Sequence, residues 1–195
     1  MGVCLSWVAF HGRDPQGVLD ELGWRRTGAH EEFPESPTTC TTLRPGWFLI
    51  AMVSRADAYD GRVDLGSLSR GAEVVACFVE EHVMFSAAAF WRDGLRVWSV
   101  EHDAQEGIRH LVVAGELPAE MSAIIKESEA AQDAEDECDS EVDYIFEIPV
   151  DIAQRITDFR YDRDDVDGIE LKFDVLDHVP GQRRAGWFKS IFGGG

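Results

Sequence analysis

Positive charge is scarce in this sequence of 195 residues. It contains 18 Lys and Arg against 37 Asp and Glu, and its formal net charge is −19. A field of this sign repels the phosphates of nucleic acids and of anionic lipids, so we expect neither nucleic acid nor membrane as a partner. A partner selected by charge would be a basic protein, a cation or a DNA-binding protein. Solubility alone also accounts for an acidic surface.

Long apolar runs and closely spaced cysteines are absent as well. No stretch approaches the roughly 20 apolar residues of a membrane-spanning helix. The first apolar stretch, residues 3–10, is too short for a secretion signal and lacks its basic start. The cysteines show no CxxC spacing and we expect them to be reduced; they are Cys4, Cys40, Cys77 and Cys138. The sequence therefore predicts a cytoplasmic protein.

Motifs of known chemistry are missing too. The sequence has no GxSxG nucleophile elbow, no HExxH pair and no glycine loop placed to hold phosphates. Cys77 lies in an apolar stretch, which raises the pKa of a thiol, whereas a nucleophile needs a lowered one. We therefore assign no catalytic residue, no cofactor and no resident metal.

What the sequence does have is a strong strand pattern in its centre. Apolar residues fill 73–79, 83–91 and 95–101, and Asp93-Gly94 between the last two supplies the positive φ angles of a tight hairpin. We predict three consecutive antiparallel strands, a meander over about 73–101. It forms the centre of an α+β domain with a mainly antiparallel sheet and about three packed helices.

Other segments follow from local signals. Further strands are expected at 3–10, 24–32, 47–53, 110–114, 144–148 and 169–175. Helices are expected after Asp14-Pro15, near 65–68, over 117–131 and after Pro149. Residues 33–45, which contain three prolines and several threonines, are expected to form a surface loop.

The second half of the chain contains an acidic segment and a basic tail. Residues 127–143 contain nine acidic side chains and no basic one, so this stretch should repel itself. We expect residues 1–180 to form one domain with an acidic flexible segment near 130–141, followed by a short basic and aromatic tail, 181–195.

The tail contains the first group of candidate contact residues. Four large apolar side chains would cover one side of a short helix: Trp187, Phe188, Ile191 and Phe192. Such a segment is too short to remain helical alone, so these side chains should dock, either on the chain's own domain or on a partner, including another copy of the chain.

A second group of candidates lies at the ends of the central strands. Glu80, Glu81 and His82 place two carboxylates and an imidazole at one hairpin tip, where a cation could bind. Adjacent strand residues point to opposite faces, so the pattern favours a polar turn over a cation site. His102 and Asp103 could orient an imidazole for acid–base chemistry. These five residues form the alternative site, gathered at one edge of the sheet.

Three segments, 47–49, 73–86 and 142–153, resemble a family of uncharacterised bacterial proteins. The resemblance is carried by WFL, EVVACFVEEHVMFS and VDYIFEIPVDIA. No activity is attached to that family, so the resemblance implies a bacterial cytosolic protein and assigns no functional residue.

Acidity, abundant aromatic residues and missing catalytic signatures favour association over turnover. The sequence thus predicts a protein-interaction module of unknown partner, such as a regulator or an immunity-type inhibitor. An enzyme or a small-ligand or metal-binding protein using the alternative site is the second hypothesis. An acidic mimic of nucleic acid is the third.

Overall fold

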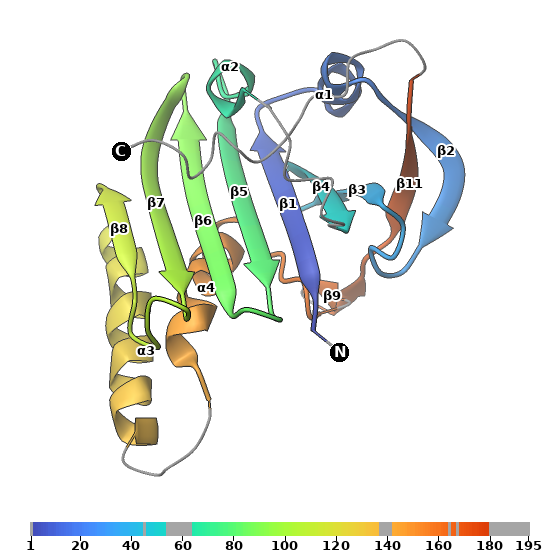
Figure 1. Ribbon diagram of the computed structural model, residues 1–195. Helices are drawn as coiled ribbons and strands as arrows, with labels where there is room; N and C mark the ends of the chain where they lie inside the picture. Colours follow the sequence, from blue (N-terminus) through green and yellow to red (C-terminus); the bar gives the residue numbers. More distant parts are fainter. Residues whose placement is uncertain are drawn as a thin grey trace.

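The computed structural model describes residues 2–44, 46–53, 64–136, 142–163, 165–166 and 168–179 (Figure 1). Within these ranges the chain forms a nine-stranded antiparallel sheet, a two-stranded sheet and four helices. The predicted α+β class with a mainly antiparallel sheet is confirmed.

The large sheet has strand order β2-β11-β3-β4-β1-β5-β6-β7-β8, so β2 and β8 are its edges. Its strands are β1 (Cys4–His11), β2 (Trp24–Glu31), β3 (Thr38–Leu43), β4 (Trp47–Val53), β5 (Glu73–Glu80), β6 (Phe85–Arg92), β7 (Leu95–Asp103), β8 (Val112–Gly115) and β11 (Phe173–His178). The small sheet pairs β9 (Asp165–Val166) with β10 (Ile169–Glu170).

The helices cover both faces of the large sheet. They are α1 (Pro15–Leu22), α2 (Leu65–Leu68), α3 (Ala119–Asp136) and α4 (Tyr144–Thr157). One face packs against α3 and α4 in a core that includes Trp7 and Val100, and the other packs against α1 and α2 in a core that includes Val8 and Phe10. Figure 1 shows α1 and α2 together at one end of the sheet.

The meander is confirmed. β5, β6 and β7 are consecutive antiparallel neighbours, and the turn between the last two uses positive φ angles at Asp93 (52°) and Gly94 (87°). The strand predicted from residue 83 begins at Phe85, because Met84 adopts a positive φ of 51° in the preceding turn. Period-two patterning and turn chemistry thus agreed with the fold here.

The predicted strand at 144–148 is wrong, because these residues open α4. Asp143 caps the helix, and its Oδ1 accepts hydrogen bonds from the backbone N–H groups of Ile145 (3.0 Å) and Phe146 (2.9 Å). Pro149, expected to start the helix, lies inside it. Burial of Ile145, Ile148 and Ile152 at helical spacing outweighs the strand preference of the individual residues.

Three further segments differ from expectation. Helix α3, predicted to end at about residue 131, continues to Asp136, and residues 137–141 lie outside the described part of the chain. The predicted loop 33–45 contains β3, an interior strand whose β-branched threonines suit a pleated, buried position. The strand expected at 169–175 is divided between β10, which ends at Glu170, and β11, which runs from Phe173 to His178.

Candidate functional site

A pocket of about 480 Å³, here called the α4 pocket, lies between the first turn of α4 and the β5–β6 turn. Its lining combines carboxylates with aromatic rings. The residues that matter for its chemistry are Glu81, Asp143, Glu147, Tyr144, Phe146 and Tyr161. Three carboxylates at one cavity set a negative potential that favours a cationic ligand.

Glu81 connects three distant parts of the chain at this pocket. Its Oε1 accepts a hydrogen bond from the Tyr161 hydroxyl (2.8 Å), and its Oε2 accepts one from the backbone N–H of Val3 (2.7 Å). Burial, together with the neighbouring Glu81 carboxylate, raises the pKa of Tyr161, so its hydroxyl remains a donor at neutral pH. Glu81 is therefore held in place while its carboxylate faces the pocket.

Asp143 links the pocket to the sheet through His102. The imidazole of His102 is fully buried, with Nδ1 2.7 Å from the His110 carbonyl oxygen and Nε2 3.2 Å from Asp143 Oδ2. The second contact has the length of an ion pair but makes no hydrogen bond of good geometry. Burial acts to raise the pKa of Asp143, yet the contacts with His102 and Phe146 N–H outweigh it and lower that pKa.

Further acidic side chains gather around Arg160, next to the α4 pocket. Its guanidinium pairs with Glu147 and Asp151 of α4, and its Nε donates to Asp162 Oδ1 (2.7 Å). Three carboxylates around one guanidinium leave a negative surplus. Burial raises the pKa of Glu147, and Arg160 counteracts it.

The five residues of the predicted alternative site do not form one cluster. Glu81 lines the α4 pocket, and His102 reaches it through Asp143. Glu80 and His82 form a separate pair, with His82 Nδ1 2.6 Å from Glu80 Oε1, and the His82 side chain is 57% exposed. Asp103 shapes a turn by accepting from Gln105 N–H (2.9 Å) and does not pair with His102, because adjacent strand residues face opposite sides.

Asp143, Glu147 and Tyr161 were missed by the sequence analysis. Once 144–157 is known to be helical, Glu147 and Asp151 stand one turn apart, and that spacing signals an acidic patch on one helix face. No comparable signal exists for Tyr161, which lies 80 residues from Glu81.

Metal ligation finds no support in the described ranges, where no three His, Cys, Asp or Glu side chains are arranged to hold an ion. Cys77 is buried between neighbouring strands, and burial raises the pKa of its thiol well above the ordinary value. The tail candidates Trp187, Phe188, Ile191 and Phe192 lie outside the described residues.

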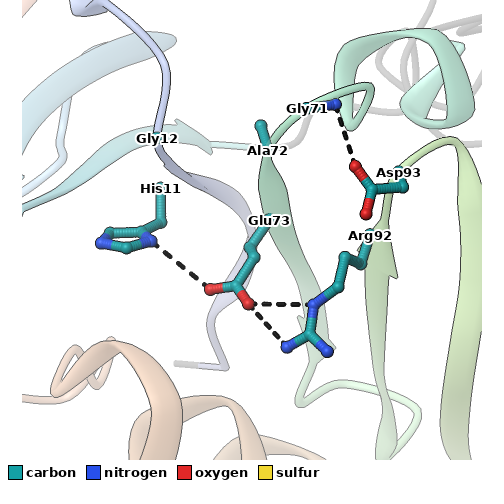
Figure 2. Close-up of a pocket in the computed structure, with 7 residues that line it drawn as sticks. All are labelled: His11, Gly12, Gly71, Ala72, Glu73, Arg92 and Asp93. Carbon is teal, nitrogen blue, oxygen red and sulfur yellow. Dashed lines mark hydrogen bonds and ion pairs between the residues drawn. The ribbon is translucent and has the colours of Figure 1, made fainter.

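A second pocket, of about 380 Å³, lies at the opposite end of β1, β5 and β6 (Figure 2). Glu73 is its centre: Oε2 lies 3.4 Å from His11 Nδ1, and Oε1 accepts from Arg92 Nε (3.0 Å) and from its terminal NH2 group (2.6 Å). Asp93 Oδ1 accepts from the backbone N–H of Gly71 (3.2 Å). The side chains of His11, Glu73 and Arg92 are partly exposed, so this second pocket is open to solvent.

Comparisons with protein-family models, with curated proteins and with solved structures find no match for this chain. In the described segments, no helix has the length and apolar character needed to cross a membrane. A function must therefore be inferred from the geometry of the two pockets and of the surface.

Proposed function

We propose that the chain is a protein-interaction module with a basic partner, and that the α4 pocket receives a cationic side chain of that partner. One observation carries this proposal: Glu81, Asp143 and Glu147 line a single cavity together with aromatic rings, in a chain of net charge −19. A regulator or an immunity-type inhibitor that covers a basic surface is the form such a module would take.

The chemistry of the pocket suits an organic cation. Aromatic faces attract ammonium and guanidinium groups by roughly 0.5–2 kcal/mol, depending on desolvation. An ionised carboxylate offers about four acceptor positions, so Glu81 retains acceptor capacity after the donors from Val3 and Tyr161 are counted. The pocket is also large enough for the head group of an arginine or lysine side chain.

A basic partner would recognise the negative charge around the α4 pocket. Arg160 is already surrounded by Glu147, Asp151 and Asp162, so its single positive charge does not neutralise the three carboxylates beside the pocket. The remaining negative potential speeds encounter with a basic surface and makes binding dependent on salt.

A matched pair of peptides tests the proposal. A short capped peptide with a central arginine should bind, whereas the same peptide with citrulline, which is nearly isosteric and neutral, should not. Glu81→Gln removes one charge but keeps one oxygen that accepts from Val3 N–H, while its NH2 group can donate to the Tyr161 hydroxyl oxygen. It should weaken the arginine peptide about fivefold, or about 1 kcal/mol. Glu170→Gln, an exposed acid on β10, is the control and should change nothing. Binding is measured by calorimetry and by NMR shifts of Tyr144 and Phe146. Equal binding of the two peptides would refute the proposal.

A second candidate function, small-ligand binding with acid–base chemistry, is favoured by the second pocket alone. A carboxylate that accepts from one nitrogen of an imidazole fixes its tautomer, and Glu73 Oε2 lies 3.4 Å from His11 Nδ1. Arg92 beside this pair would favour an anionic ligand. A titration with inorganic phosphate, followed by the ring resonances of His11, should shift them if this function holds, and unchanged resonances would remove it.

A further inference from the structure

The two edges of the large sheet are protected to very different degrees. β2 carries Arg25, Arg26 and His30, and its pairing with β11 is interrupted by a register shift. Charged side chains and irregular pairing are devices by which proteins prevent another strand from adding to an edge. The opposite edge, β8, has the sequence Val-Val-Ala-Gly with no charge.

Apolar surface is concentrated at this second edge. Of the nine large hydrophobic side chains exposed in the described part of the chain, three lie within six residues: Ile108 (47%), Val112 (50%) and Val113 (43%). β8 pairs on one side with residues 98–101 of β7, and no described strand pairs with its other side. Among the described residues, the outer N–H and C=O groups of β8 therefore have no strand partner, and they can pair with a further strand.

An acidic helix runs beside this edge. Arg109, just before β8, pairs with Asp133 (2.7 Å) and Asp136 (2.5 Å) near the end of α3, and α3 itself begins soon after β8 ends. Helix and strand are therefore antiparallel and adjacent, as Figure 1 also shows. α3 contains six acidic residues and only one lysine, Lys126.

The register shows which side chains share the face with α3. Val113 stands opposite Val100 of β7, which belongs to the core under α3 and α4. Val112 stands opposite Glu101 and therefore faces the other side of the sheet. A strand added to β8 would alternate in the same way, with every second side chain on the α3 side.

We propose that β8 is a docking edge for an extended segment of a basic partner, which adds a tenth strand to the sheet. In this docking segment, the side chains on the α3 side of the sheet are basic, and the side chains on the side of Val112 are apolar. Backbone hydrogen bonds supply affinity in strand addition, and the alternating side chains supply specificity. This docking edge is separate from the α4 pocket, and the proposal does not rest on the function proposed for that pocket.

A second copy of the chain fits this edge less well. Antiparallel pairing of β8 with β8 of a copy, about a two-fold axis, would place both α3 helices on the same face of the joined sheet. Each brings a surplus of negative charge, so the two helices would repel. A basic segment reverses the sign of that interaction.

Three synthetic peptides test the docking edge. The first alternates lysine and valine over about eight residues, the usual length of a strand. The second alternates glutamate and valine, and the third is the lysine peptide with alternate backbone amides methylated, which keeps its charge but removes its pairing edge. The lysines of the first and third peptides can also enter the α4 pocket, so protection of β8 and not total affinity is the readout. We expect only the first peptide to slow amide exchange at residues 112–115. Equal protection of these residues by the methylated peptide, or no protection by the first, would overturn the proposal.

Two valines of similar exposure provide the matched variants. Val113→Lys should weaken the lysine peptide by about tenfold, whereas Val83→Lys, at a 41% exposed valine in the β5–β6 turn, should not. Glu81→Gln should leave the protection of residues 112–115 by this peptide unchanged; if it alone removed that protection, the peptide would occupy the α4 pocket and the docking edge would be refuted. Sedimentation of the full chain checks the alternative occupant, because a dimer abolished by Val113→Lys would assign β8 to self-association instead.

Discussion

The Ser86 hydroxyl donates a hydrogen bond of 2.6 Å to the carbonyl oxygen of Phe146. Both residues are buried, and the bond ties β6 to the first turn of α4, where the α4 pocket is formed. Ser86→Ala leaves that carbonyl without this partner and should lower the free energy of unfolding by about 1–3 kcal/mol. Urea unfolding measures the loss. Ser122→Ala, at a more exposed serine of α3, is the control and should stay within about 0.5 kcal/mol.

The contact between His102 and Asp143 predicts a pH dependence of stability. Burial acts to lower the pKa of His102, but Asp143 and the His110 carbonyl outweigh it, so that pKa is raised above 6.5. A raised pKa means that the contribution of His102 is fully present below pH 6.5 and is lost as the pH rises through the folded-state value. The pKa of Asp143 is lowered from 3.8, so its contribution is present above pH 3.8 and is lost as the pH falls through the lowered value.

His102→Gln should therefore destabilise the protein most between pH 3.8 and 6.5, and less at higher pH. Unfolding curves for wild type and variant across this range give the difference. A constant difference for His102→Gln from acid to alkaline pH would mean that packing, and not the ion pair, determines its effect.

Gln132 is the buried polar group that holds the end of α3 to the start of α4. Its Nε2 donates to Asp136 Oδ1 (2.8 Å) and to the Val142 carbonyl (3.3 Å), and its Oε1 accepts from Tyr144 N–H (2.9 Å). Gln132→Ala should cost about 1–3 kcal/mol in thermal or urea unfolding. An unchanged melting temperature would show that these three hydrogen bonds contribute little to stability.

Two tryptophans distinguish core from periphery. Trp7 is fully buried, with ring centroids 5.4 Å from Phe159 and 6.3 Å from Tyr161, so Trp7→Ala should cost roughly 3–5 kcal/mol. Trp91 is only partly buried, and Trp91→Ala should cost less. Calorimetry on both variants tests the order, and a larger loss for Trp91 would contradict it.

Gly115 is required for β8 to pair with β7. Its φ is +82°, and a Cβ atom there would stand 2.1 Å from the Val97 carbonyl oxygen. Gly115→Ala should therefore detach the end of β8, which amide exchange at residues 112–115 would report. Gly168→Ala has a similar positive φ but no nearby atom, so it isolates the effect of φ from that of the clash.

Local signals in the sequence were sufficient wherever neighbours in the chain decide the structure. Asp14 and Gly23 mark both ends of α1, and Asp93-Gly94 fixes the β6–β7 hairpin. Local signals failed where residues far apart in the sequence determine the structure. The start of α4 is rich in residues that prefer strands, and the end of α3 is acidic enough to fray. Packing of Ile145 and the ion pairs of Arg109 reverse these preferences.

The same limit applies to the pocket. The hairpin tip pointed to Glu81 because a polar turn between apolar strands is visible in one sequence. Its partners Val3 and Tyr161 lie 78 and 80 residues away, and no periodicity connects positions so far apart. A single sequence therefore identifies a candidate residue but not the cavity that it lines.

The hydrogen bond between Val3 and Glu81 has a practical consequence for anyone who produces this protein. It fastens the first described residues to the wall of the α4 pocket, and Gly2 is part of the lining. An affinity tag or a fluorescent protein joined ahead of Gly2 would emerge at the mouth of the cavity and obstruct it. Interaction screens with N-terminal fusions would then miss a partner that enters there, so bait proteins should be labelled through an engineered surface cysteine far from α4.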